Sequence, residues 1–248
     1  MFEIRQHGDV TELQMNHAPA NAMDTAFVNG MRDAFGGMVD SGVKAVVISG
    51  RDGMFSGGVD VPALLPLERA AVLEFWTAFL QLMSDIATSP VPVVAAITGH
   101  SPAGGAVLAL HCDYRVAASG KFKIGLNEVQ VGLPVPSSVL GVLGFVTGQR
   151  TAQRLTMQGL LVSPDEALDA GLVDELAAPD EVVSRAVGFA ASLTALPPVA
   201  MNTTRIQAKQ GLLRSLAVVA DAEATTDYWF SDETQAAMNA LVERLQNR

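Results

Sequence analysis

Two glycine-rich segments could bind an anionic oxygen through their backbone. The first is Phe55-Ser56-Gly57-Gly58-Val59-Asp60 and the second is Ser101-Pro102-Ala103-Gly104-Gly105-Ala106, and each follows an apolar run typical of a buried strand. Glycine lets the backbone approach a ligand closely or adopt positive φ, and N–H groups at a helix start point outward with the positive end of the helix dipole. Two such loops could direct two N–H donors at one oxygen, which is an oxyanion hole. Two tight turns that bind nothing would explain the same spacing.

Glu128 is the acidic residue best placed for proton transfer. It lies in the largely apolar run Ile124-Gly125-Leu126-Asn127-Glu128-Val129-Gln130-Val131-Gly132-Leu133-Pro134. An acid in such a run is either at an exposed edge or a buried carboxylate with a raised pKa, and a general base working near neutrality needs a raised pKa. From the residues alone, we favour the exposed edge.

Other common catalytic motifs are absent from the sequence. There is no G-x-G-x-x-G followed by a suitably placed acid, no phosphate-binding G-x-x-x-x-G-K-[ST] and no G-x-S-x-G elbow. The four histidines have no metal-like spacing with cysteine or carboxylates, so we expect no metal site. Cys112 adjoins His111, but adjacent side chains diverge on a helix or strand, and we expect a buried, inert cysteine.

Composition excludes several classes of protein. The 248 residues are 49% hydrophobic and 17% charged, which suits a large globular core, and the net charge of −10 argues against nucleic-acid binding. One cysteine excludes a disulfide framework within the chain and fits a reducing compartment. The sequence begins without signal-peptide features, and apolar runs such as 91–98 and 103–110 are too short to span a bilayer. We therefore expect a cytoplasmic protein that binds neither nucleic acid nor membranes.

Strand and helix patterns alternate through the first half of the chain. Apolar residues alternate with polar ones around a His7-Gly8-Asp9 turn, which predicts a hairpin over 2–15. Period-3.6 patterns predict helices, and short β-branched runs predict buried strands. Strand followed by helix, repeated, implies parallel pairing with right-handed crossovers. The expected elements are helices at 24–40, 71–86 and 106–110, strands at 45–48, 93–97, 114–117 and 122–124, and a turn at 99–105.

Beyond about residue 150 the patterns become mainly helical. Ser163-Pro164-Asp165-Glu166 is a capping box with proline at the first helical position. A last strand is expected at 172–176, followed by helices that break at Pro197-Pro198 and near Ser231-Asp232. We divide the chain into an α/β core, 1–195, and a helical C-terminal region, 196–248.

The ordered set of motifs resembles the crotonase (enoyl-CoA hydratase/isomerase) superfamily. It comprises Asn21-Ala22-Met23, the two glycine-rich segments, Pro92 to Gly99, Cys112-Asp113-Tyr114-Arg115 and Ala167 to Asp174, and the likeness extends over about residues 2–246. The resemblance implies a spiral of ββα units with a helical trimerisation region, and hence a homotrimer or a dimer of trimers. It also implies an acyl-CoA thioester as substrate, with coenzyme A as part of that substrate and no separate cofactor.

Site residues follow from the same resemblance. The N–H groups of Val59 and Gly104 would hold the thioester oxygen. The substrate-binding residues would be Ser56, Gly57, Gly58, Val59, Asp60, Val61, Pro62 and Gly104. Glu128 occupies the position of one of the two hydratase glutamates, whereas Val107 occupies the position of the other and cannot transfer a proton.

Several motifs are similar to the Δ3,Δ2-enoyl-CoA isomerases of fatty-acid metabolism. They include Pro102-Ala103-Gly104-Gly105, Ile124 to Glu128 and Leu241 to Leu245. The resemblance implies isomerisation of 3-enoyl-CoA to trans-2-enoyl-CoA with Glu128 as the single acid/base. Enoyl-CoA hydration or another lyase reaction, with His100 or Asp60 as the second group, is an alternative. A non-catalytic acyl-CoA-binding protein is an alternative of another class, although the presence of Glu128 argues against it.

The rest of the substrate would need an apolar pocket and cations. Candidate walls of the acyl pocket are Leu65, Phe75, Phe79, Val135 and Leu140, although each is more often a core residue. Candidate partners for the coenzyme A phosphates are Arg5, Lys44, Arg51 and Lys209.

Overall fold

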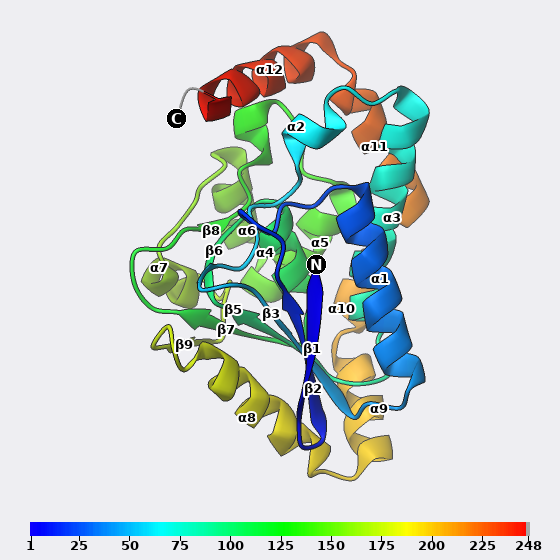
Figure 1. The fold of residues 1–248 in the computed structure, drawn as a ribbon, viewed down its shortest axis with the longest axis vertical. Helices are drawn as coiled ribbons and strands as arrows, with labels where there is room; N and C mark the ends of the chain where they lie inside the picture. Colours follow the sequence, from blue (N-terminus) through cyan, green and yellow to red (C-terminus); the bar gives the residue numbers. More distant parts are fainter. Residues whose placement is uncertain (247–248) are drawn as a thin grey trace.

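The computed structural model describes residues 1–246 as two sheets with helices around them (Figure 1). The main sheet has six strands in the order β1-β2-β3-β5-β7-β9. Its β1–β2 pair is the antiparallel hairpin predicted from the sequence, and all other pairs are parallel. The strands are β1 (Phe2–His7), β2 (Val10–Met15), β3 (Ala45–Ser49), β5 (Val93–Ile97), β7 (Tyr114–Ala118) and β9 (Glu175–Ala177).

A second, small sheet lies beyond the main one. It consists of β4 (Gly53–Met54), β6 (Gly99–Pro102) and β8 (Ile124–Gly125), all parallel. Each of these strands directly follows a main-sheet strand, so the chain repeats a unit of two strands and a connection, the spiral that the sequence predicts. The segment 99–105, expected to be only a turn, contains strand β6, and the expected strand at 122–124 is β8.

Helices cover both faces of the main sheet. On one face, α8 (Val182–Thr194) buries Val182, Ala186 and Ala190 against alternate strand residues (Figure 1). The opposite face carries the larger core, in which the predicted helices are α1 (Thr25–Asp40), α3 (Arg69–Ala87) and α4 (Gly104–His111). Asp24 begins α1 by accepting a hydrogen bond from the Phe27 N–H.

The later part of the described chain is helical apart from β9. The capping box between Ser163 and Glu166 is present at the start of α7, and the expected breaks separate α8 from α9 and α11 from α12. The remaining helices are α2 (Val61–Leu64), η1 (Glu128–Val131, a 3-10 turn), α5 (Ser137–Thr147), α6 (Gln149–Met157), α7 (Pro164–Asp169), α9 (Pro198–Ala208), α10 (Gln210–Leu213), α11 (Val218–Trp229) and α12 (Asp232–Gln246).

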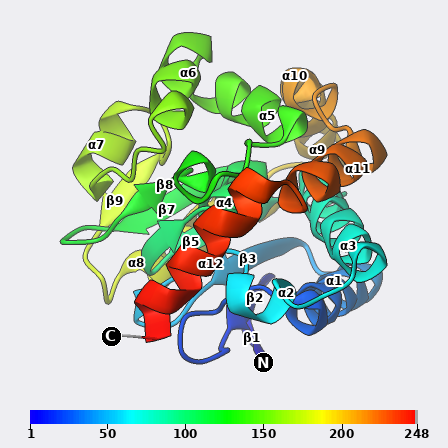
Figure 2. The same cartoon turned by 90° about the horizontal axis from the view of Figure 1, so that it is seen from above.

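The C-terminal helices return to the core. Helix α11 packs along α3, and α12 crosses above α4 and contacts α2 and η1 (Figure 2). The division into a core at 1–195 and a helical region at 196–248 stays a prediction, and residues 247 and 248 lie outside the described part. Only α3, among the single described helices, has the length and apolar composition of a membrane span, and its apolar side chains are buried in the core.

Candidate active site

The small sheet places three segments of the chain at one edge. Strand β4 leads into the loop at 55–60, β6 leads into Ala103 and Gly104, and β8 leads into Leu126, Asn127 and Glu128. Because parallel strands point the same way, their carboxyl ends meet at one edge, where ligands commonly bind in α/β folds. The predicted site residues are therefore brought together by strand pairing.

Asn21 anchors the first glycine-rich loop through hydrogen bonds. It is fully buried, and its Nδ2 donates to the carbonyl oxygens of Met15 and Phe55 at 3.1 and 2.9 Å. The Ser56 hydroxyl donates to the Asn21 carbonyl at 2.8 Å and accepts from the Gly58 N–H at 3.1 Å. These bonds fix the loop with Gly58 at φ +86°, a conformation that suits glycine.

The second loop enters α4 through a strained residue. Ala103 has φ 47° and ψ −122°, which for a residue with a Cβ costs on the order of 1–3 kcal/mol. Its N–H donates to the Gly125 carbonyl at 2.8 Å, which ties the strained turn to β8. The strain places Gly104 at the first position of α4, where an N–H has no partner within the helix.

The two loops approach each other at Val59 and Gly104. A Cβ added to Gly104 would lie 3.3 Å from Gly58 Cα and 3.4 Å from Val59 N. Neither the Val59 N–H nor the Gly104 N–H donates a hydrogen bond within residues 1–246. Two free donors on neighbouring segments that line one cavity can bind one oxygen atom together.

Glu128 faces the same space and is buried, so our preference for an exposed edge was wrong. Its exposed fraction is 9%, and burial raises the pKa of its carboxyl from 4.5 to about 7. Its Oε2 has no hydrogen-bond partner in the described chain. Sequence patterning could not show that η1 turns this acid inward at the end of β8.

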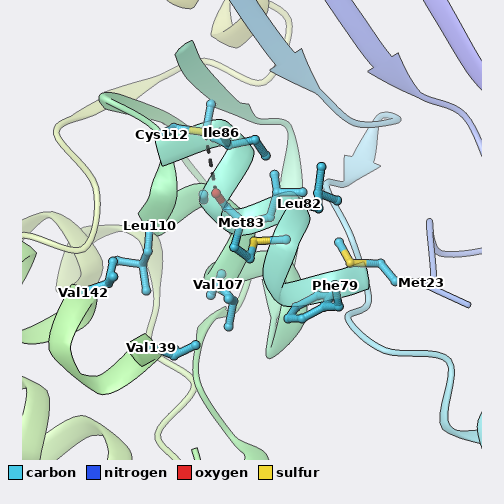
Figure 3. Close-up of a cluster of buried hydrophobic side chains, with 14 of the residues drawn as sticks. Met23, Phe79, Leu82, Met83, Ile86, Val107, Leu110, Cys112, Val139 and Val142 are labelled. Atoms are coloured by element: carbon cyan, nitrogen blue, oxygen red, sulfur yellow. Dashed lines mark hydrogen bonds between the residues drawn. The ribbon is translucent and has the colours of Figure 1, made fainter. Parts of the chain in front are cut away.

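The three segments enclose one end of a cavity of about 260 Å³. Glu128 is the only ionisable side chain among the described residues that line it. Figure 3 shows Phe79, Val107 and Val139, which line the cavity from α3, α4 and α5 at the margin of the main core cluster. The cavity therefore combines one isolated acid, two free N–H donors and an apolar wall.

Unpaired polar atoms concentrate at this cavity. Six buried side-chain N or O atoms lack a hydrogen-bond partner in the part of the chain that the structure describes, and four belong to residues that line the cavity. Buried polar groups are normally paired, so this concentration indicates a ligand site. The four atoms are Trp76 Nε1, Asn127 Oδ1, Glu128 Oε2 and Trp229 Nε1.

The predicted substrate-binding residues divide into two groups. Gly57, Val59, Val61, Pro62 and Gly104 line the cavity. Ser56, Gly58 and Asp60 do not line it. They hold the loop instead, Ser56 and Gly58 through the bond between them and Asp60 by accepting from the Ala63 N–H at 3.0 Å, as the N-cap of α2.

The prediction of the acyl-pocket walls was mostly wrong. Phe79 lines the cavity, whereas Leu65, Phe75, Val135 and Leu140 do not. Leu140 is one position past Val139 on α5, a rotation of about 100°, so it points outward and is 38% exposed. The polar lining residues missed were Trp76, Trp229 and Asn127, because only the packing of α3 against α11 and the turn at η1 bring them to the cavity.

The other predicted groups lie away from the cavity. His100 accepts from the Lys123 N–H through Nδ1 and does not line the cavity, nor does Asp60, so neither is a second group beside Glu128. Lys209 is wrong as a phosphate ligand because its buried Nζ lies 2.7 Å from Asp113. Arg5 and Lys44 form exposed ion pairs with Glu3 and Asp9, while Arg51 forms no ion pair within residues 1–246.

Cys112 is buried, as predicted. Its thiol donates to the Leu108 carbonyl (Figure 3), and burial raises the pKa of this thiol to about 12.

Comparison with known proteins shows the family. The model of the enoyl-CoA hydratase/isomerase family matches residues 5–248. The chain belongs to the enoyl-CoA hydratase/isomerase family. This family member is 30% identical over 242 residues to the mitochondrial enoyl-CoA delta isomerase 1 of Homo sapiens, and the match covers 96% of this chain and 80% of that one. It is 34% identical over 169 residues to a putative enoyl-CoA hydratase of Thermus thermophilus, covering 67% and 66%.

Solved structures confirm the crotonase-type fold of this family member. The crystal structure of human mitochondrial Δ3-Δ2-enoyl-CoA isomerase superposes with a TM-score of 0.94 at 28% identity, covering 99% of this chain and 98% of that one. A probable enoyl-CoA hydratase from Mycobacterium tuberculosis superposes with a TM-score of 0.82 at 28% identity, covering 100% and 99%.

Proposed function

We propose that this protein is a Δ3,Δ2-enoyl-CoA isomerase that converts 3-enoyl-CoA to trans-2-enoyl-CoA. The observation that carries the proposal is that Glu128 is the one ionisable side chain lining the cavity in the described chain. Water addition of the two-carboxylate kind needs a second acid, and Val107, buried on α4, occupies that position. A double-bond shift needs only one proton-transfer group.

In this mechanism the Val59 and Gly104 N–H groups bind the thioester oxygen. The Glu128 carboxylate removes a proton from C2, and the C–H electrons conjugate through the double bond to give a dienolate whose charge rests on that oxygen. The protonated carboxyl then delivers the same proton to C4, which leaves the double bond between C2 and C3. A pKa of about 7 supports this role, because the group gives and takes a proton with similar ease near neutrality.

The apolar wall supports the same proposal. A dry site strengthens the hydrogen bonds to the developing oxyanion and denies water to the dienolate. Coenzyme A enters as part of the substrate, and none of these steps needs a separate cofactor.

The test of this proposal compares two substrates. Purified protein is mixed with a 3-enoyl-CoA, and formation of the conjugated thioester is followed by ultraviolet absorbance. In parallel, a trans-2-enoyl-CoA is supplied and the 3-hydroxyacyl product is measured by chromatography. We expect rapid conjugation and little hydration; hydration without conjugation would overturn the proposal.

We also propose that the protein forms a homotrimer or a dimer of trimers. The helical region carries exposed apolar residues that suit a subunit interface, among them Leu196, Val199 and Val219 at 48, 80 and 68% exposure. Light scattering coupled to size exclusion should give about three or six times the 26.0 kDa chain mass. A monomeric mass would contradict the assembly without affecting the assignment of the acid.

A further inference from the structure

Both tryptophans of the chain line the proposed acyl cavity. The chain has two, Trp76 on α3 and Trp229 on α11, and their exposed fractions are 4% and 0%. Their ring centroids are 6.0 Å apart in an edge-to-face arrangement. The two indoles thus form one aromatic corner, on the wall where α3 packs along α11.

Both indole N–H groups are buried without a hydrogen-bond partner among residues 1–246. A buried tryptophan N–H usually finds an acceptor, and leaving one unpaired is destabilising. Phenylalanine, such as Phe79 in the same cavity, would pack an acyl chain without that penalty. A purely hydrocarbon ligand therefore does not account for two tryptophans here.

Side chains of the cavity itself do not pair with these donors. The lining acceptors are Asn127 Oδ1 and Glu128 Oε2, and both are also unpartnered in the described structure. The aromatic neighbours of Trp76, which are Phe75, Phe79 and Trp229, offer no acceptor oxygen. An acceptor oxygen on a bound ligand would pair with these donors.

We propose that Trp76 and Trp229 select acyl thioesters whose acyl chain carries an oxygen atom, as an ether, hydroxyl or ketone, in addition to the thioester oxygen. The indole N–H groups donate to that oxygen, while the rings pack against the neighbouring methylenes. This inference rests on the proposed function for its acyl-CoA substrate and adds a specificity to it. Both tryptophans are specificity residues in this proposal, and neither takes part in the proton transfer.

The test uses pairs of 3-enoyl-CoA substrates of equal length, in which one distal methylene is replaced by an ether oxygen at successive positions. For each pair, the ratio of kcat/KM for the ether to that for the hydrocarbon is measured. We expect one oxygen position at which Trp76→Phe or Trp229→Phe lowers this ratio about five-fold, the contribution of a single neutral hydrogen bond. Taking a ratio cancels the general effect of each variant on folding and catalysis.

A control variant distinguishes the loss of a hydrogen-bond donor from a change in the shape of the cavity wall. Phe79→Leu alters the same wall without removing a donor, so the ratio at the selected position should match that of the wild type. Ratios that are equal in the wild type and both tryptophan variants at every oxygen position would overturn the proposal. A ratio that falls equally in Phe79→Leu would overturn it as well, because packing would then explain the selectivity.

A second readout is independent of turnover. Since both tryptophans line the cavity, intrinsic fluorescence reports on it directly, and each single variant isolates one indole. Saturated acyl-CoA pairs are titrated, and we expect the ether to red-shift the emission of at least one indole relative to its hydrocarbon partner. A shift without any isomerisation would refute the proposed function while supporting oxygen recognition, and identical spectra with intact isomerisation would refute the oxygen recognition alone.

Discussion

Two buried carboxylates of this fold have opposite surroundings. Asp113 lies 2.7 Å from Lys209 Nζ and 2.9 Å from an Arg205 guanidinium nitrogen, and it accepts the Val93 N–H at 2.8 Å. Glu128 shares its cavity with no cation in the described chain, and its Oε2 has no partner. The Asp113 side chain is 9% exposed and Glu128 as a whole residue is 9% exposed, so both carboxylates are largely removed from solvent.

The difference shows that burial alone does not prepare an acid for catalysis. Asp113 is held by two cations and a backbone donor, and it joins helix α9 and the residue after it to the edge of strand β5. Glu128 shares its cavity with no cation in the described chain, and the hydrogen bond from its own backbone offsets its burial only in part, so burial raises its pKa to about 7. Asp113 therefore has a structural role, whereas Glu128 remains available for proton transfer.

The largest expected contrast is in activity. Glu128→Gln should lower kcat for isomerisation about 10³-fold, within the range for loss of a general acid/base, because the amide cannot accept the C2 proton. Asp113→Asn, tested on the folded protein below its melting temperature, should change kcat only a few-fold. The measurement is the ultraviolet conjugation assay; comparable losses in both variants would remove the distinction between the two acids.

The proposed oxyanion donors can be tested in the same activity assay as Glu128. Gly104→Ala places a methyl group 3.4 Å from Val59 N, which crowds the two loops at the proposed donors, and should lower kcat about 10²-fold, similar to the loss of one oxyanion donor. Gly36→Ala is a matched control, because a Cβ at that helical position meets nothing within 4 Å. An unaltered kcat in Gly104→Ala would place the oxyanion site elsewhere.

The free energy of unfolding, unlike kcat, should depend more on Asp113 than on Glu128. Asp113→Ala leaves two buried cations without their partner and should lower the free energy of unfolding by about 3–5 kcal/mol. Urea denaturation followed by circular dichroism measures the loss. Asp9→Ala, which removes an exposed ion pair with Lys44, should change it little. If the two variants are equally stable, the Asp113 cluster has no structural role.

A smaller and opposite effect is expected for Glu128→Gln. The pKa of Glu128 is about 7 in the folded chain and 4.5 without burial, so the native state binds more protons between these values. The stability of the wild type therefore falls as pH rises from about 4.5 to about 7. Glutamine does not ionise, so the variant should be more stable at pH 8 by up to about 3 kcal/mol, with the gain absent at pH 4. Equal unfolding free energies at pH 8 would show that Glu128 is not destabilised by burial.

Sequence patterns predicted the main elements, but of the small sheet they predicted only β8, at 122–124. Period-2 and period-3.6 patterns suffice for the β1–β2 hairpin, for α1 and for strand β5, whose limits match the expected 93–97. Strand β4 has only two residues, too few for a pattern to develop, and β6 lies in the glycine-rich segment that is typical of a turn. The site depends on those short strands.

Within the site, motif residues were easier to predict than walls. The ordered motifs pointed to Val59, Gly104 and Glu128, and the structure brings these residues to one cavity. The burial of Glu128 and the two tryptophans depend on contacts between distant helices, which local patterning does not encode. The domain boundary, the trimer and the cytoplasmic location stay predictions.

The most direct test of the central claim is the pH dependence of kcat/KM for isomerisation by the wild type, since this quantity reports the pKa values of the free enzyme. A base with a pKa of about 7 predicts a rate that rises tenfold per pH unit below pH 7 and levels off above it. A profile that stays flat from pH 8 down to pH 5 would mean that Glu128 ionises like an exposed carboxylate. That result would contradict the account of an isolated buried acid as the single proton-transfer group.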